Sequence, residues 1–108
     1  MTKHEKKMEK IALDIRKYLK EEDLWYDTRI YFNSMCFCSN TEGGIIEDIN
    51  PKDYFEYANP KTLSMSFEGP LYEVINYGDG GEGIRNILEK YGYYFELGNA
   101  WNLSIYEL

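Results

Sequence analysis

The chain has 108 residues, of which 44% are hydrophobic and 17% aromatic, and its formal net charge is −7. A chain of this length and composition predicts one globular domain over residues 1–108. It has no apolar run near the roughly 18 residues that a membrane helix needs, and no hydrophobic segment follows the charged residues 1–10. We therefore expect a cytoplasmic protein with no membrane partner.

The charge is unevenly distributed along the chain. Residues 1–20 contain seven basic groups against three acidic ones, a net +4, so the remainder carries −11 within the total of −7. Such an acidic body repels phosphate backbones and attracts basic partners. We expect no direct nucleic-acid binding through it, and the basic first segment is the single exception to consider.

Residues 3–20 are predicted to form an amphipathic helix. Apolar residues such as Ile11 and Ile15 lie on one helical face and lysines crowd the other. Thr2 and Glu5 have the spacing of a capping box at its start. The pattern favours a helix packed on a sheet with its basic side in water, and the alternative is electrostatic contact with nucleic acid or an anionic surface.

Residues 25–39 are rich in aromatic and β-branched side chains and predict a hairpin that turns at Asn33 and Ser34. In this register Ile30 faces Phe37, and the two strands share a clean apolar face.

The opposite face of this hairpin carries Arg29, Tyr31, Cys36 and Cys38. Such a face is either exposed or covered by another segment, and it is a possible partner site, although a half-covered sheet is the more frequent explanation. The two cysteines point the same way along one strand, too far apart for an easy disulfide, so we expect reduced thiols in a cytosolic setting.

The middle of the chain predicts short elements. A loop over residues 40–50, with an extended piece at Ile45 and Ile46, leads to a short helix over 51–57 that begins with proline. Residues 62–67 alternate apolar side chains with serines, which predicts a half-buried strand.

Gly69 and Pro70 allow two interpretations. Either they turn a hairpin that pairs Phe67 with Tyr72, or Pro70 begins a short helix that stops at Gly78. We favour the helix, because proline at the start and glycine at the end is the expected asymmetry and the apolar residues between them have helical spacing.

Residues 79–108 predict a helix followed by a hairpin. Ile84 and Leu88 belong to the apolar stripe of the helix, Asp79 caps its start with Glu82 reaching back, and Gly92 supplies a left-handed stop.

For the hairpin itself we prefer a three-residue turn over 98–100, with Leu97 facing Trp101 and Phe95 facing Leu103. This register gathers the large apolar groups on one side, whereas a two-residue turn sets Glu96 opposite Trp101.

Together these elements predict an α+β domain with an antiparallel sheet of about five strands and helices packed on one face. The predicted order is helix, two strands, short helix, strand, short helix, helix and two strands.

No residue set predicts catalysis, a cofactor or a metal. The only histidine, His4, lies in the first turn of a basic helix and is poorly placed to activate a cysteine. One Cys-x-Cys without a second pair does not make a zinc site, and the acids within 47–56 do not match a calcium loop. The glycine-rich stretch 78–83 carries acids and no lysine, which favours helix capping over phosphate binding.

A binding surface is the remaining interpretation. The eleven tyrosines cannot all be buried in a domain this small, and exposed tyrosine is enriched at interfaces. We therefore expect a non-enzymatic protein that binds another protein, one with a basic surface, without a cofactor. The candidate interaction surface consists of Glu47, Asp48, Asp53, Tyr54, Glu56, Tyr57 and Glu73.

Two alternatives stay open. One is an inhibitor of a DNA-binding protein that imitates DNA by its charge, as small phage or plasmid proteins do. The other is a small-ligand-binding domain or small enzyme, which requires a concave pocket, and a cleft lined by Tyr31, Cys36 or Cys38 would favour it.

Overall fold

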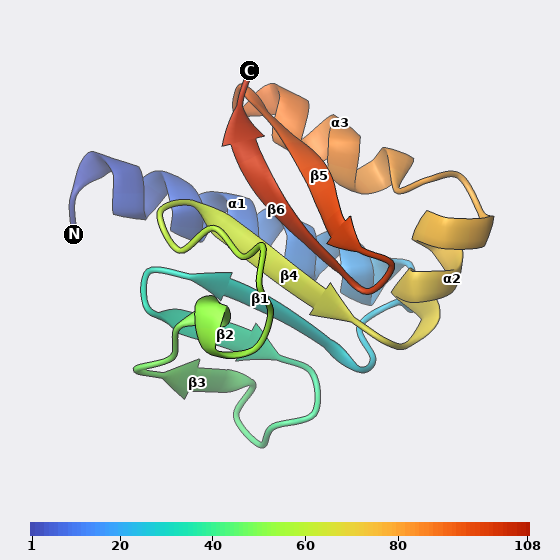
Figure 1. Cartoon of the computed structure of the whole chain (residues 1–108), viewed down its shortest axis with the longest axis horizontal. Coiled ribbons are helices and arrows are strands. Elements are labelled where there is room, and N and C mark those ends of the chain that lie inside the picture. The colour runs from blue at the N-terminus through green and yellow to red at the C-terminus, as the bar shows by residue number, and fades with distance from the viewer.

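A twisted antiparallel sheet with helices on one face makes up the fold, which a computed structural model describes over residues 1–108 (Figure 1). The sheet has six strands in the order β3-β2-β1-β4-β6-β5. The strands are β1 (Thr28–Phe32), β2 (Met35–Cys38), β3 (Ile45–Glu47), β4 (Leu63–Phe67), β5 (Tyr93–Asn99) and β6 (Asn102–Glu107). The helices are α1 (Lys3–Glu21), α2 (Pro70–Tyr77) and α3 (Glu82–Lys90), with one 3-10 turn, η1 (Pro51–Asp53).

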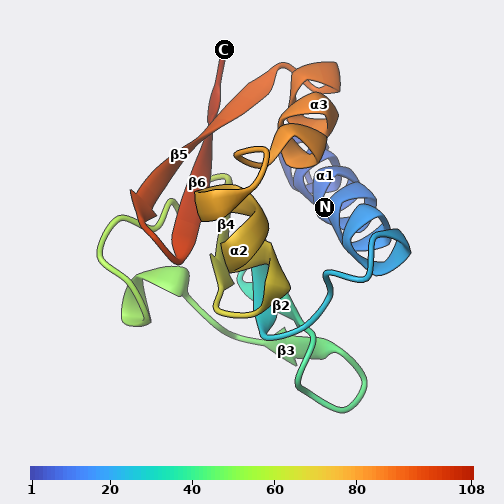
Figure 2. The same cartoon turned by 90° about the vertical axis from the view of Figure 1, so that its right-hand side faces the viewer.

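The predicted α+β class with helices on one face is confirmed. Figure 2 shows α1 and α3 on one side of the sheet and the segment with η1 on the other. The sheet has one strand more than the five expected, because the extended piece at Ile45 and Ile46 pairs with β2 as the edge strand β3.

The main core lies between the sheet and the helices. Ile11 and Ile15 of α1 and Leu88 of α3 are fully buried against side chains such as Ile30 and Met65 at the centre of the sheet. Each such side chain removed from water contributes about 1.5–3 kcal/mol. The core thus uses the apolar stripes that the periodicity predicts.

Several local signals act as expected. The Thr2 hydroxyl accepts from the Glu5 amide and the Glu5 carboxylate accepts from the Thr2 amide, both at 3.0 Å, which completes the capping box. Asn33 and Ser34 have φ values of 50° and 61°, as a tight hairpin turn requires, and Ile30 pairs with Phe37. The first hairpin is therefore confirmed in register.

The predictions for the second half of the chain hold at α2 and at the end of α3, and only in part at its start, where Gly81 is the N-cap. Residues 70–77 are helical and end at Gly78, so the hairpin alternative is wrong. Gly92 has a φ of 82° after α3. Asp79 accepts from the amides of Gly81 and Glu82, at 2.9 and 3.3 Å. Glu82 is the first residue of the helix and does not reach back.

The helix predicted over 51–57 is only the 3-10 turn η1. Beyond it the chain turns back, so that Phe55 and Ala58 become buried against the sheet. A continuous helix would not place these two apolar side chains on the sheet together with Ile49. Their burial therefore outweighs the local preference for a helix that begins at Pro51.

The register predicted for the last hairpin is wrong. Leu97 pairs with Leu103 and Phe95 with Ile105, a β-bulge follows Leu97, and the chain turns at Ala100 and Trp101. Because the strands are shifted by two residues relative to the prediction, Phe95 and Leu103 keep the expected face. Trp101 leaves this face and packs against Phe55 on the other side of the sheet.

Gly83 permits the close approach of α3 to α1, because a Cβ atom built there would lie 2.2 Å from the Tyr18 ring. Although alanine usually stabilises a helix relative to glycine by up to about 1 kcal/mol, we expect Gly83→Ala to lower the free energy of unfolding in urea by about 1–3 kcal/mol. The matched control Asn86→Ala, at an exposed position of the same helix, should not destabilise. In a Tyr18→Leu background the loss should disappear, and an equal loss in both backgrounds would refute this contact.

Candidate functional site

The face of the sheet opposite the helices carries a row of polar and small side chains. Arg29 on β1 lies between Cys38 on β2 and Ser66 on β4 in the register of the sheet. Tyr31 follows two residues along β1 and pairs with Cys36. The prediction that Arg29, Tyr31 and both cysteines share one face is thus confirmed, and this face lies away from the main core.

The segment between β3 and β4, residues 48–62, covers part of this face. Its Ile49, Phe55 and Ala58 form a second buried cluster with Tyr31 and the two cysteines. Burial of these apolar side chains fixes the segment on the sheet.

Hydrogen bonds to two small residues hold the same segment. The amide of Asn59 donates to the Ser64 hydroxyl at 2.8 Å, and the Ser104 hydroxyl donates to the carbonyl of Tyr57 at 3.2 Å. The two serine hydroxyls lie 2.7 Å apart on neighbouring strands. Short side chains at these positions let the segment approach the sheet closely, so this part of the face is filled.

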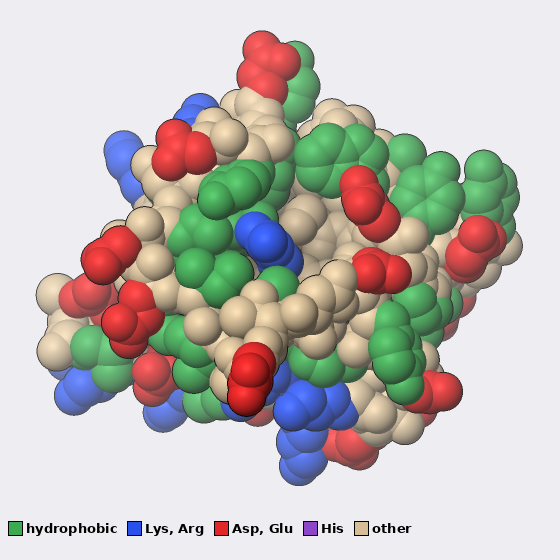
Figure 3. Space-filling model, turned by 90° about the horizontal axis from the view of Figure 1, so that it is seen from below, with side chains coloured by type: hydrophobic (Ala, Val, Ile, Leu, Met, Phe, Trp, Pro, Cys, Tyr) green, Lys and Arg blue, Asp and Glu red, His purple; other side chains and the backbone are tan.

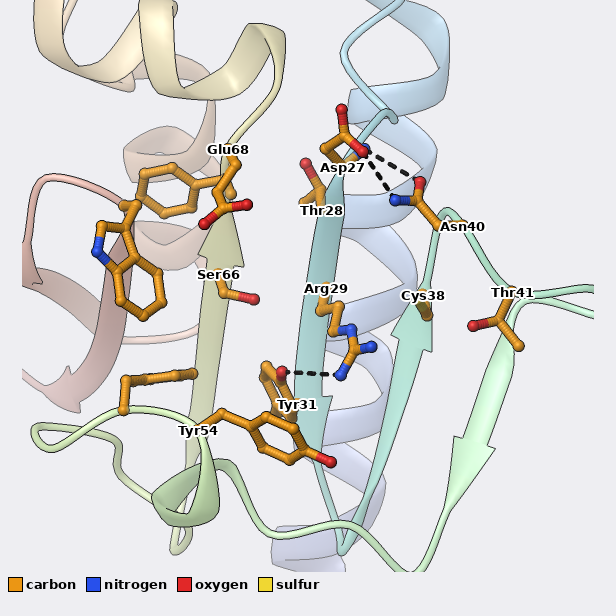
Figure 4. Close-up of a pocket in the computed structure, with 13 residues that line it drawn as sticks. Asp27, Thr28, Arg29, Tyr31, Cys38, Asn40, Thr41, Tyr54, Ser66 and Glu68 are labelled. Carbon is orange, nitrogen blue, oxygen red and sulfur yellow. Dashed lines mark hydrogen bonds between the residues drawn. The ribbon is translucent and has the colours of Figure 1, made fainter.

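The uncovered part of the face forms a cleft of about 490 Å³ (Figure 4). Arg29 is the only basic residue that lines it. Figure 4 shows Glu68 and Asp27 at one end of the cleft and Tyr54 at the other, with Arg29 and Ser66 between them. We call this the sheet cleft.

Aromatic rings from three separate segments line one side of the sheet cleft. Tyr31 and Phe55 have ring centroids 5.6 Å apart and Phe55 and Trp101 5.9 Å apart, both edge to face. Tyr54 lies against Tyr31 at 6.0 Å. Such pairs contribute beyond their buried area, about 0.5–1.5 kcal/mol each. The rings therefore connect the covering segment to the sheet and to the last hairpin.

Arg29 is half-buried in the sheet cleft and makes no ion pair with Asp27 or Glu68, the two acids that line it. It donates to the Tyr31 hydroxyl over 3.4 Å, and its guanidinium carbon lies 5.5 Å from the centre of the Tyr54 ring. The hydrogen bond to Tyr31 raises the pKa of Arg29 further, although burial acts in the opposite direction. Arg29 is therefore a permanent positive charge that no carboxylate of the chain neutralises.

The two cysteines are free, buried thiols with opposite shifts of pKa. Burial raises the pKa of Cys36 to about 11. Burial also acts to raise the pKa of Cys38, but hydrogen bonds from Thr41 and from the amide of Asn40, together with the Arg29 charge, bring it below its ordinary value. Cys38 is the thiol that lines the sheet cleft.

Neither a histidine nor a cluster of metal ligands lines the sheet cleft. His4 lies 2.6 Å from the carbonyl oxygen of Lys61 and does not line the cleft, so Cys38 has no histidine as a base. No three His, Cys, Asp or Glu side chains gather closely enough to hold a metal ion. A cation, hydroxyl groups and aromatic rings remain, which can together recognise a ligand.

The structure divides the predicted interaction surface. Six of its residues are exposed between the end of β3 and the start of β4: Glu47, Asp48, Asp53, Tyr54, Glu56 and Tyr57. Of these, Tyr54 lines the sheet cleft. Glu73 lies on α2, away from η1 (Figure 1). The acids visible in Figure 3 are spread around that side of the molecule, with basic groups among them.

Some cleft residues carry no signal in the sequence. Trp101 was expected on the core face, and Ser66 reads as the polar side of a half-buried strand. The sequence offers one signal for Phe55, an aromatic residue without a polar group, which favours burial over its tyrosine neighbours. The alternation at Arg29 and Tyr31 was the stronger signal, because it placed functional groups on a face without helices.

No protein-family model matches this chain, and neither a curated protein nor a solved structure matches it. No helix combines the length and apolar character needed to cross a bilayer. The fold and the sheet cleft define an α+β protein with a half-covered sheet. The ligand of this protein must be inferred from the residues of the cleft.

We expect iodoacetamide at about pH 8 to alkylate Cys38 before Cys36 in the folded protein, because the thiolate is the reactive form and Cys38 has the lower pKa and lines the cleft. The rate at Cys38 should rise with pH and level off above its pKa. Mass spectrometry of the digested protein measures both sites. In urea the two rates should converge, and faster alkylation of Cys36 in the folded protein would contradict the assignment.

Proposed function

We propose that this chain is a non-enzymatic protein that binds another protein through the sheet cleft and the exposed segment beside it. The sheet cleft is the observation that carries the proposal. Aromatic rings line this concavity, among them Tyr54 (Figure 4) and also Trp101. Concave aromatic surface of this kind is typical of recognition sites.

The exposed tyrosines beside the cleft support a macromolecular partner. Tyr54 is 54% and Tyr57 63% exposed, although both side chains are large and amphipathic. Tyrosine supplies contact area at a small cost in conformational entropy. The acids Asp53 and Glu56 flank these rings and would steer a partner with a basic surface.

The free thiols support a reducing compartment, and we propose that the protein acts in the cytoplasm. Cys38 has no histidine beside it, which favours binding over covalent catalysis. We do not extend the proposal to imitation of DNA, because the acids visible in Figure 3 are spread out and not aligned.

A small-molecule ligand is the second candidate function, and two observations favour it. The volume of about 490 Å³ lies within the range of about 300–1,000 Å³ that ligand pockets occupy. Arg29 also offers a charge within the cleft that no side chain of the protein neutralises.

We expect Tyr54→Ala to weaken binding of the partner by about tenfold or more, since central aromatic residues dominate interface energies. The matched control is Tyr77→Ala, on α2 and 76% exposed, which should leave affinity unchanged. Proteins captured from the source cells on immobilised wild-type chain would be identified by mass spectrometry and titrated by calorimetry against both variants, with circular dichroism to verify folding. Equal weakening by both variants, or turnover of a substrate in the cleft, would contradict the proposal.

A further inference from the structure

We infer that the sheet cleft binds an oxyanion, a carboxylate or phosphate group, that is carried next to an aromatic or apolar moiety, with Arg29 as the anchor. The inference rests on the proposed use of the cleft for binding and adds the chemistry of the group that enters it. The oxyanion can belong to a free small molecule or to a side chain of a protein partner.

The position of Arg29 is fixed by the sheet. β1 is an inner strand paired on both sides, with Cys38 and Ser66 opposite Arg29 on its neighbours. Arginine presents several N–H donors in a planar fork that matches a carboxylate or phosphate. Within the chain it bonds the Tyr31 hydroxyl, at 3.4 Å, and the Cys38 sulfur, so other N–H donors of the fork remain for a ligand.

Neutral hydroxyl groups surround the guanidinium where an oxyanion would lie. Ser66 points into the cleft beside Arg29, and the Tyr31 hydroxyl lies next to it (Figure 4). Hydroxyl donors strengthen the binding of an anion without adding charge.

The carboxylates at the end of the cleft do not occupy this position. Asp27 accepts from the Asn40 side chain at 2.7 Å, and Figure 4 shows it beyond Thr28, away from the guanidinium. Glu68 is exposed, so water screens its charge. An anion that reaches Arg29 therefore meets a cation that neither carboxylate of the cleft pairs with.

The aromatic rings on one side of the cleft account for the apolar part of the ligand. The Tyr54 ring lies 5.5 Å from the guanidinium carbon, and Phe55 and Trp101 also line the cleft. A ring or aliphatic group attached to the oxyanion would contact these side chains when the charged group reaches Arg29.

The experiment titrates the ¹⁵N-labelled chain with 3-phenylpropionate and with its neutral amide, and follows the Arg29 Nε–H and the Trp101 indole N–H by NMR. We expect the carboxylate to bind about tenfold or more tightly than the amide, as a hydrogen bond to a charged group implies. Arg29→Gln should remove this difference. Arg85→Gln, which changes another arginine placed over an aromatic ring, Phe95 at 4.9 Å, should preserve it.

The same titration with phenyl phosphate and with the peptide acetyl-Phe-Glu-amide distinguishes the sources. Tighter binding of the peptide than of both small molecules assigns the oxyanion to a protein side chain, and the reverse order assigns it to a free ligand. Bound carboxylate should also slow alkylation of Cys38, because it displaces solvent at that thiol and neutralises Arg29.

Equal binding of carboxylate and amide, or an Arg29→Gln variant that is folded and binds as the wild type does, would overturn the inference. Should Arg29→Gln lose its fold, Arg29→Lys keeps the charge without the planar fork and should bind the carboxylate more weakly than the wild type. If Arg29 shows no preference for the carboxylate but partner capture still depends on Tyr54, the oxyanion inference is rejected. The protein-binding proposal then remains.

Discussion

The alternation of side chains along β1 is the constraint on which both the core and the cleft depend. Ile30 and Phe32 point to the helices, whereas Arg29 and Tyr31 point to the opposite face. A slip of one residue in pairing would exchange these sets and place the guanidinium beneath α1. Burial of an unpaired charge there would cost several kcal/mol. The stability of the core therefore also fixes where the cation of the cleft lies.

The cleft exists because the covering segment fills only part of the face. Ser64 and Ser104 accept and donate the hydrogen bonds that hold residues 48–62 over β4 and β6. Phe55 then joins the segment to both Tyr31 and Trp101. These contacts leave the β1 and β2 positions around Arg29 open and hold the walls in place without a ligand. A preorganised cleft of this kind loses little entropy when a ligand binds.

The sequence predicts best those features that are decided locally. The capping box at Thr2 and the turn at Asn33 each depend on neighbouring residues, and both are confirmed. The last hairpin was misplaced because a shift of two residues preserves the face of every side chain, so hydrophobic pattern alone cannot choose between the registers. The position of Trp101 is decided by Phe55, which is distant in the chain. For the same reason the polar face was predicted, but the aromatic wall beside it was not.

Arg29 is the residue that stability explains least. A half-buried guanidinium without a carboxylate partner pays a desolvation cost, and the ring of Tyr54 offsets only part of it, since such a contact contributes about 0.5–2 kcal/mol. An aliphatic side chain at this position would lie beside Tyr54 without that cost. Where a sequence departs from the rules of burial with no structural gain, a functional site is the expected reason. This departure lies at the centre of the cleft, where a ligand would supply the missing charge.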